Sequence, residues 1–241
     1  MKSVKKYIPD SITSMNLLCG VIGVIFVFKC RFDIAFYMML AAALFDFCDG
    51  LAARLLDAYS DLGKELDSLA DVVSFGVLPA LMLIQMMKVC SFSDVFWCYI
   101  PLVIAVFSGV RLAKFNIDPR QHESFIGLPT PACAMICGSL CYYMAHDPNT
   151  FLAAWGVGYI FIPVLSVILA ALLVCEIPMF SMKFSRERSE ALVMRKRLSF
   201  LINVAIIIAI VAFLGLNWSL VVLLSFIVYI LMNIAFAIFK I

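Results

Sequence analysis

The chain has 241 residues, of which 65% are hydrophobic and only 14% charged, with a mean hydropathy of +1.07 and a net charge of +2. This composition excludes a soluble globular domain, in which charged residues make up about a quarter of the chain. In a bilayer each spanning segment must satisfy its own backbone hydrogen bonds, and helices do so. The composition therefore predicts an all-α, polytopic integral membrane helix bundle.

The first ten residues carry Lys2, Lys5 and Lys6 beside apolar side chains. They predict a short amphipathic segment, Met1 to Asp10, on the lipid surface, and Pro9 precedes the first span. Eight apolar runs follow, each long enough to cross a hydrocarbon core of ~30 Å, although some only just. These runs cover approximately residues 12–28, 34–56, 63–87, 95–115, 131–145, 151–175, 200–216 and 218–239. An even number of spans places both termini on the same side of the membrane.

An acidic stretch, Asp46–Asp71, lies where the second and third runs meet around the polar link 56–62. Its acidic and small residues recur every three or four positions, the spacing that places side chains on one face of a helix. The second run ends with Asp46, Asp49, Gly50 and Ala53, and the third begins with Gly63, Asp67 and Asp71. Two antiparallel helices with this pattern would bring four carboxylates together at one end.

Carboxylates gathered in mostly apolar surroundings repel one another unless a cation or protons neutralise them. Hard cations such as Mg²⁺ prefer oxygen ligands and bind between protein carboxylates and substrate phosphates. The glycines and the alanine would leave helix surface bare for a ligand, and Arg54 adds a planar cation suited to phosphate. The alternative is a salt-bridged structural hairpin, but only Arg54 and Lys64 are available locally to balance the acids. The pattern therefore favours a divalent metal site.

The acidic stretch resembles the signature of the CDP-alcohol phosphotransferase family, because every position of D-x2-D-G-x2-A-R-x8-G-x3-D-x3-D is filled. The resemblance implies transfer of a phosphatidyl or phospho-alcohol group from a CDP-linked donor to an alcohol, with release of CMP. It also implies two Mg²⁺ or Mn²⁺ ions, a homodimer, and Asp71 as the general base. The implied metal ligands are Asp46, Asp49, Asp67 and Asp71, and the implied CDP-binding residues are Gly50, Ala53, Arg54 and Gly63.

Three more stretches are similar to those of family members whose acceptor is L-serine. PDSITSMNLLCG, residues 9–20, implies that Thr13 and Asn16 join the CDP-binding surface, although helix capping is an alternative explanation. RLAKFN and FIGLPTPA, residues 111–116 and 125–132, lie at the ends of neighbouring spans. They imply binding of the acceptor or the lipid phosphate by Arg111, Lys114, Asn116, Gly127, Pro129 and Thr130. The donor would be CDP-diacylglycerol, the acceptor L-serine and the product phosphatidylserine.

Every lysine and arginine except Lys29, Arg31 and Lys88 lies on the side of the acidic stretch. The positive-inside rule therefore places the acidic site and both termini at the cytoplasmic face. Residues 1–180 would form the membrane domain of the family, and residues 181–241 a basic cytoplasmic loop with a C-terminal transmembrane hairpin. The basic loop predicts contact with anionic membrane lipids and not with nucleic acid.

Other interpretations stay open at this point. Arg111 and Lys114 alone would also suit anchoring of a span at the cytoplasmic face. A different acceptor, such as glycerol 3-phosphate or inositol phosphate, would need extra cations, which these residues and Arg120 could supply. An ion-coupled transporter would also carry acids within the membrane, but ion passage gives the fixed glycine and alanine positions no role.

Overall fold

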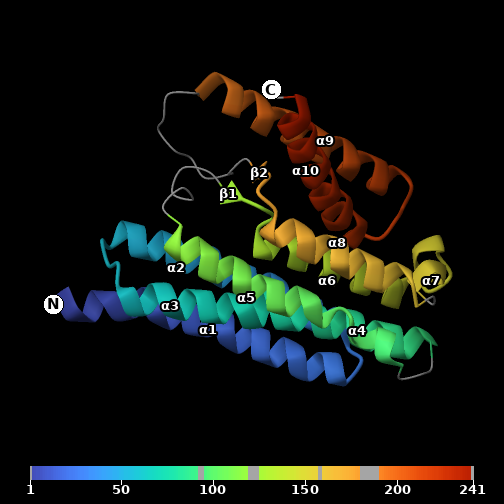
Figure 1. Cartoon of the computed structure of the whole chain (residues 1–241), viewed down its shortest axis with the longest axis horizontal. Helices are drawn as coiled ribbons and strands as arrows, with labels where there is room; N and C mark the ends of the chain where they lie inside the picture. Colours follow the sequence, from blue (N-terminus) through green and yellow to red (C-terminus); the bar gives the residue numbers. More distant parts are fainter. Residues whose placement is uncertain (1, 92–94, 119–124, 157–158, 180–189, 240–241) are drawn as a thin grey trace.

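The computed structural model describes residues 2–91, 95–118, 125–156, 159–179 and 190–239. In these ranges the chain is almost entirely helical, with one two-stranded ladder, which confirms the predicted all-α bundle (Figure 1). Six helical segments of this described part are long and apolar enough to cross a membrane. These segments are Tyr7–Phe28, Phe32–Leu55, Asp61–Cys90, Phe96–Ile117, Met194–Phe213 and Ser219–Ile238.

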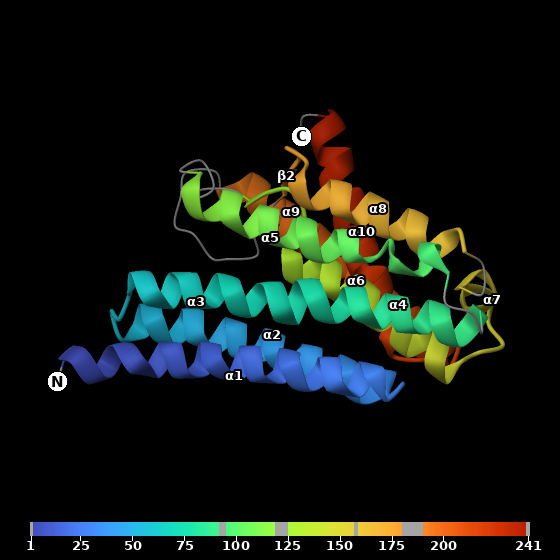
Figure 2. The ribbon, with the colours of Figure 1, turned by 60° about the horizontal axis from the view of Figure 1, so that its bottom comes forward.

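The first three long helical segments lie side by side (Figures 1 and 2). They are α1 (Lys2–Phe28), α2 (Phe32–Leu55) and the continuous run of α3 (Asp61–Asp71), η1 (Val72–Val77) and α4 (Leu78–Ser91). Helix α1 runs through Pro9 without interruption, so residues 2–10 of the predicted surface segment continue into the first span as one helix. A proline near the start of a helix removes one backbone hydrogen bond, and the later turns of α1 retain theirs.

The segment η1 is a π-helix that begins directly after Asp71. A π-helical insertion changes the face on which the following side chains point, and such insertions are frequent at functional sites. The insertion lies against α1, where the Ser74 hydroxyl donates to the Asn16 carbonyl at 3.1 Å. A Cβ on Gly20 would collide with Ser74, so the absence of a side chain at Gly20 permits the close approach of α1 to η1.

The remaining elements of the central region are η2 (Phe96–Tyr99), α5 (Leu102–Ile117), α6 (Thr130–His146), α7 (Phe151–Gly156) and α8 (Phe161–Val174). Almost every side chain of α6 is buried by the surrounding helices, so contacts with protein surround most of this helix. The predicted continuous span 151–175 is wrong, because two shorter helices, α7 and α8, occupy this stretch. Gly156, a poor helix former, ends the first of them.

The connection into α6 is fixed to the end of α8. Strands β1 (Phe125–Ile126) and β2 (Pro178–Met179) pair antiparallel, and the Leu128 amide donates to the Leu172 carbonyl at 2.8 Å. Gly127 has a φ of +79°, and a Cβ there would lie 2.7 Å from the Leu173 carbonyl oxygen. Glycine is therefore required at this position both by the backbone conformation and by the close packing.

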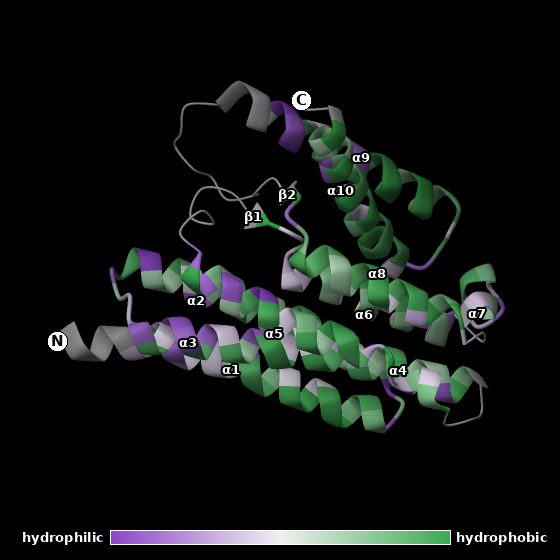
Figure 3. Cartoon of the chain, in the orientation of Figure 1, coloured by the Kyte–Doolittle hydropathy of each residue, from purple (hydrophilic) through white to green (hydrophobic). Residues whose placement is uncertain are grey.

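The C-terminal hairpin consists of α9 (Glu190–Phe213) and α10 (Ser219–Phe239). The basic loop predicted between the sixth and seventh apolar runs is shorter than expected, because residues 190–197 already belong to α9. Residues 180–189 lie outside the described ranges. Helix α10 packs along α6, and Trp218 just before it stacks on Tyr37 of α2 with ring centroids 6.2 Å apart. In Figure 3 hydrophilic residues gather at the ends of α2, α3 and α5 on one side of the bundle, whereas most helical surface elsewhere is apolar.

We expect Gly127→Ala to destabilise the fold by about 1–3 kcal/mol, because alanine strains the positive-φ backbone. Thermal unfolding of the purified protein in detergent would measure this loss. Gly109→Ala is the matched control, since Gly109 lies inside α5 and no described atom lies within 4 Å of the point that its Cβ would occupy. Equal unfolding temperatures for the two variants would contradict the structural role of Gly127.

Candidate active site at one end of the bundle

Three aspartates meet where α2 and α3 join. Asp46 and Asp49 lie near the end of α2 and Asp67 lies in α3, and one carboxylate oxygen from each lies within 4.8 Å of the others. The turn between the helices includes Asp57 at a φ of +48° and Ser60, whose hydroxyl accepts from the Gly63 amide at 2.9 Å and caps α3. The structure therefore brings together these three predicted metal ligands, which we call the acidic triple.

Asp71 lies one helical turn beyond Asp67, as the last residue of α3, and is buried. Its charge interacts with those of all three members of the acidic triple, most strongly with Asp46. The Asn16 side chain of α1 donates through Nδ2 to Asp71 Oδ1 at 3.2 Å. Asp71 is therefore a buried fourth carboxylate next to the acidic triple, and Asn16 of α1 orients one of its oxygens.

Thr13 also orients a carboxylate from α1. Its Oγ1 lies 2.6 Å from Asp49 Oδ2 and 3.0 Å from the Pro9 carbonyl oxygen. Thr13 and Asn16 lie in the interior of α1 and are fully or almost fully buried, which excludes helix capping as the explanation of these residues. Their spacing of three residues places both on the face of α1 that meets the acids.

The donor set of the acidic triple fits a hard divalent cation, since it offers carboxylate oxygens and strong negative charge. The two cations available locally make other contacts. Arg54 Nε donates to the Gly50 carbonyl at 2.9 Å and Lys64 Nζ to the Asn116 carbonyl at 3.0 Å.

The residues predicted to bind CDP differ in their surroundings. Gly50 is exposed, and no described atom lies within 4 Å of the position of a Cβ, so helix surface is open there. Arg54 is exposed and Ala53 half-buried on the same helix. At Gly63, in contrast, a Cβ would lie 2.7 Å from Asp10 Oδ1 and 2.9 Å from Ser60 Oγ. The close approach of α1 and the helix cap therefore account for the glycine at this position, a reason that the sequence did not reveal.

The three predicted site residues of the RLAKFN stretch lie in different environments. Arg111 is 6% exposed and interacts electrostatically with Asp71 of α3. Lys114 is exposed on the surface of α5. Asn116 Nδ2 donates to Ser68 Oγ at 2.9 Å and so connects the end of α5 to α3. Of these three residues, Arg111 is the buried one and the one whose charge interacts with that of the predicted general base.

The FIGLPTPA stretch ends at the first turn of α6. Pro129 precedes this helix and Thr130 is its first residue. The Thr130 side chain is 0% exposed, and within the described ranges its hydroxyl has no hydrogen-bond partner. Arg111 is similar, because its Nε is buried and no described group accepts from it. Both side chains therefore keep hydrogen-bonding capacity for a ligand.

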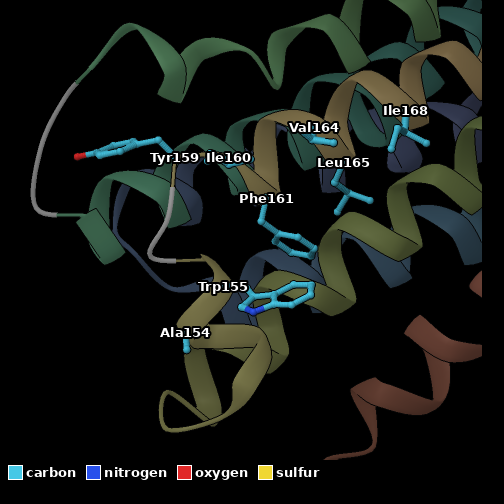
Figure 4. Close-up of a pocket in the computed structure, with 8 residues that line it drawn as sticks. All are labelled: Ala154, Trp155, Tyr159, Ile160, Phe161, Val164, Leu165 and Ile168. Carbon is cyan, nitrogen blue, oxygen red and sulfur yellow. The ribbon is translucent and has the colours of Figure 1, made fainter.

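A separate pocket of about 570 Å³ lies beside α7 and α8 (Figure 4). Trp155, Phe161 and Leu165 contribute to its wall, and none of the lining residues labelled in the figure is charged. In Figure 1, α7 lies at the opposite end of the bundle from the α2–α3 turn. This mostly apolar pocket suits contacts with lipid or other apolar groups.

Fold and site together define a membrane-embedded helical protein with a carboxylate cluster suited to a divalent cation at one end. Residues 6–169 match the family model described as CDP-alcohol phosphatidyltransferase. The chain belongs to this family, which confirms the family resemblance of the acidic stretch. The matched range ends in α8, so α9 and α10 lie outside it.

Similar relatives share one name, CDP-diacylglycerol–serine O-phosphatidyltransferase. The Bacillus subtilis protein is 35% identical over 130 residues, which cover 54% of this chain and 72% of the relative. The Mycobacterium bovis protein is 36% identical over 156 residues, which cover 61% of this chain and 54% of the relative. The Methanocaldococcus jannaschii protein is 33% identical over 143 residues, which cover 58% of this chain and 64% of the relative. Except for the Bacillus subtilis protein, the match spans less than two thirds of these relatives.

We expect Asn116→Ala to lower the free energy of unfolding by about 1 kcal/mol, because the hydrogen bond between α5 and α3 is lost. Lys114→Ala, two residues away and exposed, is the control and should change stability by less than about 0.5 kcal/mol. Chemical or thermal unfolding in detergent would measure both. An unchanged stability in Asn116→Ala, combined with a raised KM for a substrate, would show that Asn116 acts in binding and not as a structural link.

Proposed function

We propose that this chain transfers the phosphatidyl group of CDP-diacylglycerol to the hydroxyl of L-serine, giving phosphatidylserine and CMP. The observation that carries the proposal is the position of Asp71. This buried carboxylate interacts electrostatically with the acidic triple, which suits a metal and a pyrophosphate, and with the buried cation Arg111, which suits the carboxylate of an amino acid. The names of the similar relatives favour serine over other acceptors.

On the donor side, Asp46, Asp49, Asp67 and Asp71 would hold two Mg²⁺ or Mn²⁺ ions. When bound, these ions would neutralise charge on the pyrophosphate and on the departing CMP. The exposed side of α2 at Gly50, Ala53 and Arg54, together with Gly63, would bind the CDP group. Thr13 and Asn16 would support this surface by orienting Asp49 and Asp71.

On the acceptor side, the serine Oγ would attack the phosphorus of the phosphatidyl group. The new P–O bond forms as the bond to CMP breaks, and Asp71 takes the hydroxyl proton as general base. The hydrogen bond from Asn16 holds the Asp71 carboxylate in a fixed orientation, so that its charge is available where the acceptor binds. A single displacement of this kind needs no covalent nucleophile from the protein.

The acceptor carboxylate would bind to Arg111 and to the first turn of α6 at Thr130, since helix N-termini favour anions. Lys114, exposed on α5, would serve the phosphate of the lipid donor. Asn116, Gly127 and Pro129 would act indirectly by fixing the ends of α5 and α6 against their neighbours.

We further propose that the acidic site and both termini face the cytoplasm, because almost all cations lie on that side. Residues 1–180 would contain the complete chemistry of the family, and residues 181–241 would add the basic segment and the hairpin. The basic segment would contact anionic membrane lipids. Assembly as a homodimer stays a prediction from the family resemblance.

The proposal is tested by CMP release from CDP-diacylglycerol with Mg²⁺ or Mn²⁺, using purified protein in detergent. Serine, glycerol 3-phosphate and inositol phosphate are compared in parallel. We expect release that depends on serine and is lost with EDTA. Release with a different acceptor alone would overturn the choice of serine and keep the chemistry of the family. Absence of release with every acceptor would overturn the proposed reaction and favour a transporter.

Two substitutions separate metal binding from proton transfer. Asp67→Ala should weaken Mn²⁺ binding by at least about tenfold, since even groups that only support metal ligands contribute this much. Asp71→Asn should lower kcat by about 10²–10⁴-fold, the usual contribution of a general base, while retaining CDP-diacylglycerol binding. Electron paramagnetic resonance of free Mn²⁺ measures binding, and CMP release measures turnover.

Asp33→Asn is the matched control for both substitutions, because Asp33 lies in the same helix as Asp46 but pairs with Arg31 in the first turn. It should retain Mn²⁺ binding and turnover. Turnover near the unsubstituted rate in purified Asp71→Asn would contradict the assignment of the general base.

A further inference from the structure

Ser108 lies in α5, one helical turn before Arg111, and is fully buried. Residues spaced by three share a helix face, with Cβ atoms about 5–6 Å apart. In the described part of the chain, the Ser108 hydroxyl has no hydrogen-bond partner, and the same holds for Arg111 Nε. Two buried polar groups with unused hydrogen-bonding capacity therefore follow one another along this face of α5.

The unpaired hydroxyl sets Ser108 apart from other buried serines. A serine inside a helix can satisfy its hydroxyl by donating to the carbonyl one turn earlier, as Ser166 of α8 does to the Ile162 carbonyl at 2.7 Å. Ser219 and Ser225 also lack a partner among the described residues, but they lie in α10, which carries no predicted site residue. Because an unpaired buried hydroxyl costs free energy, the hydroxyl of Ser108 is available for a ligand.

The Ser108 side chain faces η1, the segment that begins directly after Asp71. A Cβ on Gly76 would lie 3.0 Å from Ser108 Cβ and 3.4 Å from Ser108 Oγ. The absence of a side chain at Gly76 therefore permits the close approach of α5 to η1. Gly76 follows Asp71 by about one turn of π-helix, so Ser108 meets this helical run just beyond the predicted general base.

A second contact aligns α5 with the run of α3 and η1. Asn116 Nδ2 donates to Ser68 Oγ at 2.9 Å, and Ser108 packs against the position of Gly76. The two contacts enclose equal numbers of residues on the two helices, which run antiparallel. The predicted general base lies between the contacts on one helix, and Arg111 lies between them on the other. Packing of the two helices therefore places the base and the cation at similar depths in the bundle.

The order of groups along this run separates the donor from the acceptor. Gly63 and Asp67, predicted to bind CDP and metal, come first, and Asp71 follows. Ser108 meets the run beyond Asp71, in the direction away from the donor groups. An acceptor whose hydroxyl reaches Asp71 would extend its other groups to this side. A hydroxyl donor one turn from a guanidinium suits a carboxylate, which accepts hydrogen bonds through two oxygens.

We propose that Ser108 is an acceptor-binding residue: its hydroxyl donates to one oxygen of the acceptor carboxylate, and Arg111 binds the same carboxylate. This inference rests on the proposed function, in which Arg111 and Asp71 contact the acceptor. It extends the acceptor site by one turn of α5 beyond the RLAKFN stretch. The bound acceptor then offsets the cost of a hydroxyl that has no partner among the described groups.

The first experiment measures steady-state kinetics and thermal unfolding of Ser108→Ala in detergent. Alanine keeps the Cβ that packs against η1 and removes only the hydroxyl, so the fold should be retained. We expect the KM for serine to rise about tenfold, as for the loss of one hydrogen bond to a charged group, and the KM for CDP-diacylglycerol to change less than about twofold. The unfolding temperature without serine should stay the same or rise, since an unpaired buried hydroxyl has been removed.

Ser166→Ala is the matched control, because Ser166 is an equally buried serine whose hydroxyl is satisfied within α8. It should leave both KM values unchanged. An unchanged KM for serine in Ser108→Ala would overturn the proposal and indicate a hydroxyl satisfied by water. A rise only in the KM for CDP-diacylglycerol would overturn it as well, because the donor would then be the ligand. Equal rises in both KM values with a lower unfolding temperature would show a purely structural serine.

Two competitors test whether the carboxylate is the group bound. L-alanine keeps the carboxylate of serine and lacks the hydroxyl, whereas ethanolamine keeps the hydroxyl and lacks the carboxylate. The concentration that halves phosphatidylserine formation is measured at a serine concentration equal to the KM of each variant. In Ser108→Ala this concentration should rise about tenfold for L-alanine and change less than about twofold for ethanolamine. Equal rises for both competitors would contradict binding of the carboxylate.

The outcomes distinguish this inference from the proposed function. If the unsubstituted protein releases CMP with serine but Ser108→Ala behaves like Ser166→Ala, the reaction stands and the role of Ser108 is refuted. If serine supports no CMP release from the unsubstituted protein, the proposed function fails and the inference fails with it.

Discussion

Oxygens from three carboxylates, all within 4.8 Å of one another at the end of an apolar bundle, repel each other strongly. The surrounding structure reduces this cost in several ways. The acidic triple lies at the helix ends and includes half-buried residues, so water reaches part of it. Thr13 and Asn16 direct polar groups to Asp49 and Asp71 from α1. The remaining imbalance is what a divalent cation would neutralise, and this requirement connects the fold to the chemistry.

The need to orient and stabilise these carboxylates also explains why α1 must lie so close to its neighbours. A hydroxyl or amide can orient a carboxylate only within hydrogen-bond distance, and bulky side chains between the helices would prevent that approach. Gly20 allows α1 to contact the π-helical segment after Asp71, and Gly63 allows Asp10 to approach the start of α3. The glycines of this region therefore serve helix packing, and of those discussed at the acidic stretch only Gly50 leaves its surface open.

The site also extends beyond the acidic stretch. Arg111 and Thr130 come from α5 and α6, and both keep buried polar atoms without a partner among the described residues. Such atoms are costly in a folded protein unless a ligand or water satisfies them. The charge of Arg111 also interacts with that of Asp71, so the candidate site extends from α2 and α3 to α5.

The sequence alone determined the helical membrane class, because its hydrophobic content leaves no other way to satisfy the backbone in a bilayer. It also determined the acidic stretch and the family, since spacings of three and four residues fix which side chains share a helix face. Local spacing could not reveal where a helix bends, so the continuity of α1 through Pro9 and the division into α7 and α8 were missed. Only the tertiary structure decided that Thr13 and Asn16 hold carboxylates and that Arg111 is buried whereas Lys114 is exposed. These contacts join residues far apart in the chain, and packing between helices, which no local pattern encodes, brings them together.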